Sequence, residues 1–154
     1  MPKYWERVKH QKFRSIIISV DAATKETYEK IRVGGKWEEL LTSLSLIAEK
    51  RNKFEHIVIN MTVMRSNYRE IPQFIDLAES YGFNVTFQGM VGQGRHGNYG
   101  HENIFKLKDA KALNELRNIV INESSRTRSI EVGWKDLLIY LGLLSSQGNL
   151  HVGR

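Results

Sequence analysis

Three polar residues near the start of the chain have the types and the spacing of a ligand-binding site. Ser19 and Asp21 end a β-branched run, and Arg32 follows after a short helical pattern. Side chains alternate along a strand, so we expect Ser19 and Asp21 to share a face at its carboxyl end, where parallel α/β folds bind ligands. A hydroxyl and a carboxylate suit the hydroxyl groups of a sugar, and Arg32 can return over the pocket to hold a carboxylate by two hydrogen bonds.

The same residues also have a purely structural interpretation. Asp21 can cap the helix that follows it, and Arg32 can be a solvated surface residue. Residue types alone do not decide between ligand binding and a structural role, so both interpretations stay open here.

The elements that must position these residues alternate between strand and helix. Short, β-branched apolar runs predict buried strands at residues 14–20, 56–64 and 84–88. Helical patterns separate them: one begins after Thr24, one begins at Trp37, and one has Pro72 in its first turn and ends at Gly82. This alternation favours parallel pairing through right-handed crossovers, so the predicted fold class is α/β.

Three strands make an incomplete structure. A closed parallel barrel needs about eight strands, and edge strands expose unpaired backbone groups unless something covers them. We therefore expect the chain either to associate with itself or to be a fragment of something larger.

The pattern changes beyond Gln88. A glycine-rich loop at 89–103 precedes a predicted helix at 109–122, a polar link at 123–129 and an apolar helix at 134–144. We therefore divide the chain into 1–107, which holds the strand and helix units, and 108–154, a carboxyl-terminal helical segment and tail.

Two stretches of the chain resemble the radical S-adenosylmethionine enzymes, in particular the branch whose members often carry a cysteine-rich carboxyl-terminal extension. The stretches are IISVDAATKETYEKIRVGGKWEELL and HIVINMTVMRSNYREIPQFIDLAESYGFNVTFQ, and the resemblance extends from Ile16 to Gln88, about half of the chain. It implies that 1–107 is about half of a TIM-like (β/α) barrel, with the three strands as the fourth, fifth and sixth of a partial barrel.

The resemblance also implies roles for individual residues. Ser19 and Asp21 would contact the ribose and methionine part of S-adenosylmethionine, and Arg32 would reach its carboxylate. Asn60 and Gln88 are further candidates for cofactor binding, because they are polar residues within apolar strands. A structural hydrogen bond is the alternative for Asn60, and Asn67 is interpreted as a turn residue only.

The chain departs from this family in its cluster ligands. It contains no cysteine, and the family's three-cysteine motif and the stretch that binds the cofactor's amino group are both absent. We therefore expect a fragment of an iron-sulfur oxidoreductase that contributes part of the S-adenosylmethionine-binding wall and is inactive alone. In this interpretation the chain has no catalytic or metal-binding residue, binds the cofactor weakly or not at all, and leaves the 4Fe-4S cluster to the complete parent protein.

Two other functions stay open. One is a cofactor-free interaction module with a half-barrel fold, whose partner is a second copy or the missing amino-terminal half of the barrel. The other is an anion- or nucleotide-binding α/β domain that uses Gly92, Gly94 and Gly97 (GQGRHG). No apolar helix follows these glycines, as a dinucleotide site requires, so a loop over the barrel mouth is favoured. His96, His101 and Glu102 are likewise interpreted as solvated loop residues.

Composition limits the remaining classes. The formal net charge is +6, but the charges of both signs are interspersed, so a nucleic-acid partner is not favoured. The longest apolar runs are much shorter than the roughly 20 residues of a membrane span, and no signal-peptide pattern precedes them. A cytoplasmic location is the expectation.

Overall fold

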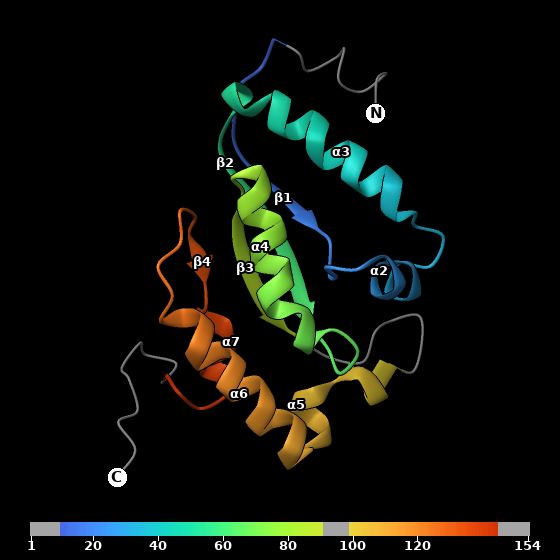
Figure 1. Ribbon diagram of the computed structural model, residues 1–154, viewed down its shortest axis with the longest axis vertical. Helices are drawn as coiled ribbons and strands as arrows, with labels where there is room; N and C mark the ends of the chain where they lie inside the picture. The colour runs from blue at the N-terminus through green and yellow to red at the C-terminus, as the bar shows by residue number, and fades with distance from the viewer. Residues whose placement is uncertain (1–9, 91–98, 145–154) are drawn as a thin grey trace.

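The chain forms a parallel β-sheet whose strand order follows the sequence. The computed structural model describes residues 10–90 and 99–144. Within them the sheet runs in the order β1 (Phe13–Ser19), β2 (Phe54–Val63), β3 (Asn84–Gly89) and β4 (Val132–Gly133), with every pair parallel (Figure 1). The predicted α/β class is therefore confirmed.

The helices between these strands begin and end close to the predicted residues. Thr24 caps the first of them, where its hydroxyl accepts a hydrogen bond from the Thr27 N–H at 3.3 Å. Gly82 ends another with a left-handed φ of 66°, a conformation that glycine adopts without strain. The elements outside the sheet are α2 (Lys25–Ile31), α3 (Trp37–Glu49), η1 (Arg51–Lys53), η2 (Tyr68–Glu70), α4 (Ile71–Tyr81), η3 (Tyr99–Glu102), α5 (Ile104–Leu107), α6 (Ala110–Ser124) and α7 (Lys135–Tyr140).

The carboxyl-terminal part differs from the prediction in two elements. β4 was not expected, because a strand of two residues leaves no periodic pattern in the sequence. It adds to the edge of the sheet through the pairs Val85–Val132 and Thr86–Gly133. The last helix, α7, is also shorter than the apolar run that predicted it. Its residue Tyr140 packs directly against Gly89 at the end of β3, where a larger residue would collide with the ring.

One face of the sheet, which we call the covered face, packs against the helices. Alternate strand residues point to it and join buried residues of α3, α4 and α6 in one apolar core. Phe74 of α4 lies against Phe87 of β3, with ring centroids 6.0 Å apart. The strand residues of this face are Ile16, Ile18, Ile57, Ile59, Met61, Val63, Val85 and Phe87.

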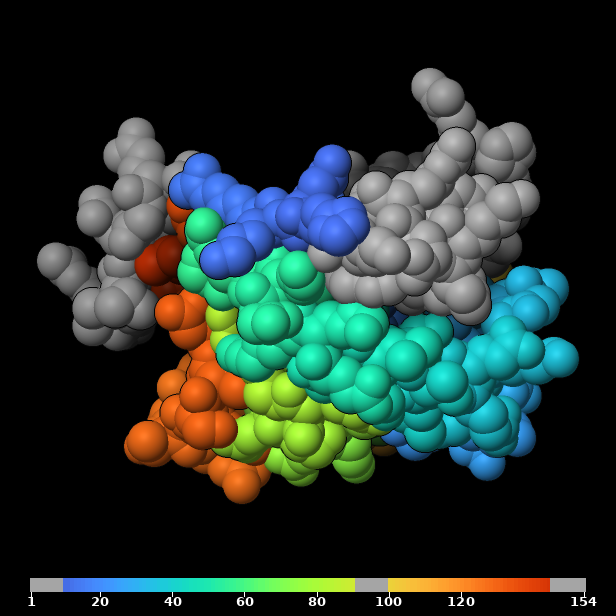
Figure 2. Space-filling model, turned by 90° about the horizontal axis from the view of Figure 1, so that it is seen from above, coloured from blue at the N-terminus to red at the C-terminus, as the bar shows by residue number. Residues whose placement is uncertain are grey.

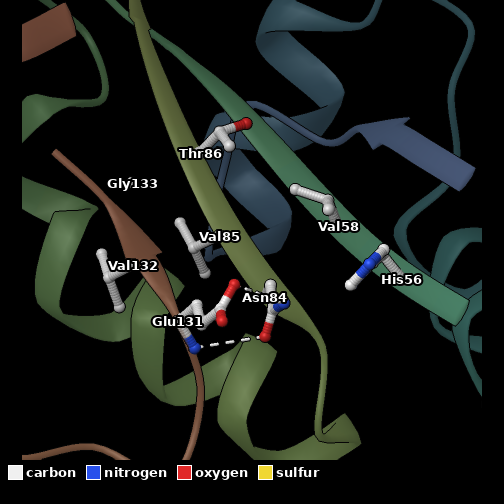
Figure 3. Close-up of a pocket in the computed structure, with 8 residues that line it drawn as sticks. All are labelled: His56, Val58, Asn84, Val85, Thr86, Glu131, Val132 and Gly133. Atoms are coloured by element: carbon white, nitrogen blue, oxygen red, sulfur yellow. Dashed lines mark hydrogen bonds between the residues drawn. The ribbon is translucent and has the colours of Figure 1, made fainter. Parts of the chain in front are cut away.

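The other face, which we call the open face, lies outside this core. Its members are Ser15, Ile17, Ser19, His56, Val58, Asn60, Thr62, Asn84, Thr86 and Gln88, which alternate with those of the covered face. Ile17 is 66% exposed. A shallow hollow of about 310 Å³ lies over the amino-terminal half of the open face, beside His56, Val58, Asn84 and Thr86 (Figure 3). A parallel sheet is normally buried on both faces, whereas the helices in the described part of the chain form a core on only one face of this sheet.

The edge strand β1 lies at the surface of the molecule. Its first residues lie beside the connection between α3 and β2 (Figure 2), where Phe13 stacks on Phe54 with ring centroids 5.6 Å apart. Within the described residues β1 pairs with β2 alone, so its other edge has no partner there. Also within this part, no helix has the length and apolar character needed to cross a membrane.

An arginine with a mostly buried side chain joins the helices behind the covered face. Arg128, in the connection from α6 to β4, pairs with Asp76 at 2.6 Å and Glu79 at 2.9 Å, both on α4. It also pairs with Glu123 of α6 at 2.7 Å. The connection between α6 and β4 is therefore fastened to α4 by charge-assisted hydrogen bonds.

Candidate functional site at the carboxyl edge of the sheet

Asp21 lies at the carboxyl edge of the sheet, in a conformation that is rare for a residue with a side chain. Strand pairing of β1 ends at Ser19, and the N–H groups of Val20 and Asp21 both donate to the Asn60 carbonyl, at 3.0 and 3.3 Å. Asp21 then adopts a φ of 64° and is buried. Because the backbone leaves the strand here, simple alternation does not relate Asp21 to Ser19. Left-handed residues with a side chain are often aspartate or asparagine, and they are concentrated at functional sites.

The Asp21 carboxylate joins β2 to the end of α2. One oxygen, Oδ1, accepts a hydrogen bond from the backbone N–H of Thr62 at 2.6 Å. The other, Oδ2, accepts from Nη2 of Arg32 in an ion pair. The structure therefore brings Asp21 and Arg32 together, as two of the predicted site residues.

The turn after α2 aims Arg32 at this carboxylate. The Arg32 N–H donates to the Tyr28 carbonyl at 2.8 Å, and its own carbonyl accepts from the Gly35 N–H at 2.7 Å. Gly34 takes a φ of 84°, and a side chain at Gly35 would collide with the Arg32 carbonyl and the Tyr28 ring. The two glycines therefore let the chain reverse tightly and leave the Arg32 side chain directed back toward β1.

The Arg32 guanidinium has a donor that its protein partners do not use. Its side chain is 40% exposed. Its Nε atom is nevertheless buried and has no hydrogen-bond partner among the described residues. An unpaired buried N–H is uncommon in proteins and points to a missing acceptor. A carboxylate is the natural acceptor, because arginine binds it through two parallel N–H groups.

Asn67, interpreted from the sequence as a turn residue, does more than form a turn. Its side chain is fully buried, with an exposure of 0%. Its Oδ1 accepts from the Met64 N–H at 2.7 Å, and its Nδ2 donates to the carbonyls of Thr62 at 2.8 Å and Asp21 at 2.9 Å. It thus fastens the end of β1 to the end of β2. The contact with Met64 is local, but nothing in the sequence indicates the contact with Asp21.

Glu70 is a second residue of this edge that sequence reasoning missed. Its carboxylate accepts hydrogen bonds from the N–H groups of Ala23 at 2.7 Å and Thr24 at 3.2 Å. It also accepts from the hydroxyls of Thr24 and Thr27. Glu70, the last residue of η2, therefore fixes the start of α2 and sets the direction in which α2 leads to Arg32.

The other three candidate residues lie on the open face. Ser19 is paired in register with Asn60, and Asn60 with Thr86, so the three form one row across the strands. Asn60 is buried, and its Oδ1 accepts from the Thr86 hydroxyl at 3.0 Å. Gln88 is exposed and lies one row further toward the carboxyl edge, beside Thr62. This geometry gives Asn60 a structural hydrogen bond and leaves Ser19 and Gln88 accessible.

The glycine motif with Gly92, Gly94 and Gly97, together with His96, lies outside the described residues. The end of that loop is described: Glu102 accepts from the Ser66 N–H through Oε2 at 2.9 Å, and its Oε1 is 3.7 Å from His101 Nε2. In the described part of the chain, no three histidine, aspartate or glutamate residues are grouped as metal ligands.

Comparison with known proteins assigns no family to the chain, so its function is argued from the geometry described above. No protein-family model, curated protein or solved structure matches the chain.

Proposed function

We propose that the chain is one wall of a partial (β/α) barrel of the radical S-adenosylmethionine type. In this proposal Ser19, Asp21 and Arg32 contribute to binding of S-adenosylmethionine. Asn60 and Gln88, on the open face, are further residues of the cofactor-binding wall. The remaining strands belong to another part of the same polypeptide or to a partner. The parent protein would be an oxidoreductase, and this wall alone would be inactive.

The observation that carries the proposal is the unused donor of Arg32. The amino-acid portion of S-adenosylmethionine ends in a carboxylate, and Arg32 offers a buried Nε with no acceptor in the described structure. Asp21, held by the Thr62 N–H, keeps the guanidinium in place through its Nη2 atom. The residues present therefore fit a carboxylate ligand at the edge where parallel folds bind their ligands.

The one-sided sheet also supports a barrel wall. In a closed (β/α) barrel, helices cover the outer face and the inner face is filled by residues from the other strands. The covered face has its helices, and the open face carries Ile17 at 66% exposure and the row of Ser19, Asn60 and Thr86. Further parallel strands would bury this face and pair with the edge of β1 that has no partner among the described residues.

A 4Fe-4S cluster does not fit this chain. Such clusters are held by cysteine thiolates, and the sequence contains none. When bound in a complete enzyme, the cluster would supply the electron that cleaves the cofactor. The residues of this chain would hold and orient the cofactor only.

The test is a titration of the 154-residue chain with S-adenosylmethionine, in which amide chemical shifts measured by NMR report binding. We expect weak, saturable binding with shifts near Asp21 and Arg32. Arg32→Gln should weaken it about tenfold or more, as expected for loss of a charged hydrogen bond. Arg14→Gln, a change of the same type at an exposed position of β1, is the matched control and should have no effect.

Three results would contradict the proposal. They are equal affinities for Arg32→Gln and wild type, an equal loss in both arginine variants, and stoichiometric cluster incorporation on anaerobic reconstitution. Thermal melting of each variant separates lost binding from lost folding.

The open face favours a second candidate, a cofactor-free interaction module. A second copy of the chain could bind to the exposed Ile17 and to the edge of β1 that is unpaired within the described residues. Light scattering across a concentration series distinguishes the two: the module should form dimers through this face, and Ile17→Lys should abolish them. A chain that stays monomeric at high concentration contradicts the module.

A further inference from the structure

We propose that the chain binds a small aliphatic amino acid, as a zwitterion, in a pocket beside the carboxyl end of β2. The pocket has a volume of about 160 Å³. Its walls come from the end of α2 with the loop after it, from the turn after β2, and from η3. Neither Asp21 nor Arg32 lines it, so this inference does not rest on the proposed cofactor site.

Glu102 provides a fixed acceptor in this pocket. Its carbonyl accepts from the Arg65 N–H at 2.9 Å and its Oε2 from the Ser66 N–H at 2.9 Å, so two backbone groups of one turn hold it in position. Its side chain is 18% exposed, and its Oε1 lies 3.7 Å from His101 Nε2, which is longer than a hydrogen bond. Apart from this long contact with His101, Oε1 accepts no hydrogen bond from the described residues and can accept one from a ligand.

Ser66 adds a second acceptor beside the first. Its hydroxyl oxygen is buried and has no partner among the described residues, although buried hydroxyls are normally hydrogen-bonded. Ser66 also donates its N–H to Glu102 Oε2, so the two side chains are neighbours, and both line the pocket. A primary ammonium group carries three N–H donors and can satisfy both oxygens, with charge assistance from Glu102.

Apart from His101, which lies beside Glu102, the rest of the lining suits the other two parts of an amino acid. Lys30 supplies a cation for a carboxylate at the mouth of the pocket. Ile31, the buried Met64 and Val33, which is 90% exposed, supply apolar surface for an aliphatic side chain. An enclosed protein cavity of roughly 150 Å³ accommodates benzene, so a ligand of about six to eight non-hydrogen atoms fits this space. L-Valine has that size and all three parts.

The experiment compares three probes on the full chain: L-valine, n-butylamine and butyrate. We expect saturable amide shifts at Ser66 and Glu102 with L-valine, and affinities at least about tenfold lower for the two probes that lack one charged group. Glu102→Gln keeps an acceptor for the Ser66 N–H but loses the charge, and it should weaken L-valine binding about tenfold or more. Lys30→Gln should weaken it by a smaller factor, because Lys30 is exposed.

The matched control is Glu131→Gln, an exposed glutamate at the hollow of the open face, which should leave L-valine binding unchanged. Three results would overturn the inference: no saturation with L-valine at high millimolar concentration, butyrate binding as tightly as L-valine, or equal binding by Glu102→Gln and wild type. The probe series on wild type decides the matter even if a variant fails to fold. Titration with S-adenosylmethionine tests the other site separately, because Asp21 does not line this pocket and no shift of its amide is expected from L-valine.

Discussion

The two faces of the sheet differ although they are built from the same strands. On β2, Ile57, Ile59 and Met61 point into the apolar core, whereas His56, Val58 and Asn60 alternate with them on the open face. The covered face is stabilised by burial against the helices. The open face contains a polar row and an exposed isoleucine that no described helix covers. The same strand can therefore contribute to a packed apolar core with one set of side chains and leave the alternate set outside that core.

The largest expected effect comes from truncating one isoleucine on each face. Ile59→Ala, at a site of 0% exposure, should lower the free energy of unfolding by about 2–5 kcal/mol, through lost burial and a cavity. Ile17→Ala, at 66% exposure, should change it by less than about 0.5 kcal/mol. Urea unfolding at low protein concentration measures both. An equal cost at the two sites would mean that the open face is buried in solution.

A smaller effect is expected from the polar row of the open face. Thr86→Val keeps the side-chain shape but removes the hydroxyl that donates to the buried Asn60 Oδ1 at 3.0 Å. The unpaired acceptor should cost about 1–3 kcal/mol of unfolding free energy. Thr62→Val, one row further along the same face, is the matched control and should stay within about 0.5 kcal/mol of wild type. If the two variants behave alike, the Asn60 oxygen is satisfied by water instead.

The smallest effect concerns the charges behind the covered face. Hydrogen bonds from the Ser129 backbone and hydroxyl, and then from Arg128, lower the pKa of Glu79 from 4.5 to about 2. A carboxyl whose pKa is lower in the folded state stabilises the protein above its unfolded pKa, and this stability is lost as the pH falls toward the folded value. The unfolding free energy of wild type should therefore decrease between about pH 5 and 2.

Glu79→Gln should flatten part of that acid dependence without abolishing it. Glu115 acts in the same window, because hydrogen bonds from Arg69 and Tyr68 lower its pKa to about 2. Urea unfolding between pH 2 and pH 6 measures the slope for Glu79→Gln, Glu115→Gln and the double variant. If the unfolding free energy of Glu79→Gln depends on pH as steeply as that of wild type, the pKa of Glu79 is not lowered in solution.

The sequence predicted the elements whose signals are local. Thr24 before α2, Pro72 in the first turn of α4 and Gly82 at its end each act on neighbouring backbone groups, so their positions could be predicted closely. β4 could not, because its two residues become a strand only when α6 brings them beside β3.

The candidate site shows the same division. Ser19, Asp21 and Arg32 could be singled out because strand ends and glycine turns have recognisable patterns. The residues that hold them could not. Asn67 reaches Asp21, and Glu70 reaches Thr24, in each case across 46 positions of sequence. Such long-range hydrogen bonds depend on how the strands pair, which no single stretch of sequence encodes.

The strand order of the sheet has a consequence for how the protein is made. Each strand pairs with the strand before it in the chain, in the order β1, β2, β3, β4. During synthesis the amino-terminal parts of a protein emerge from the ribosome first and can fold first. Each new strand of this sheet therefore finds its neighbour already present, and the nascent sheet can grow at one edge without waiting for the carboxyl terminus.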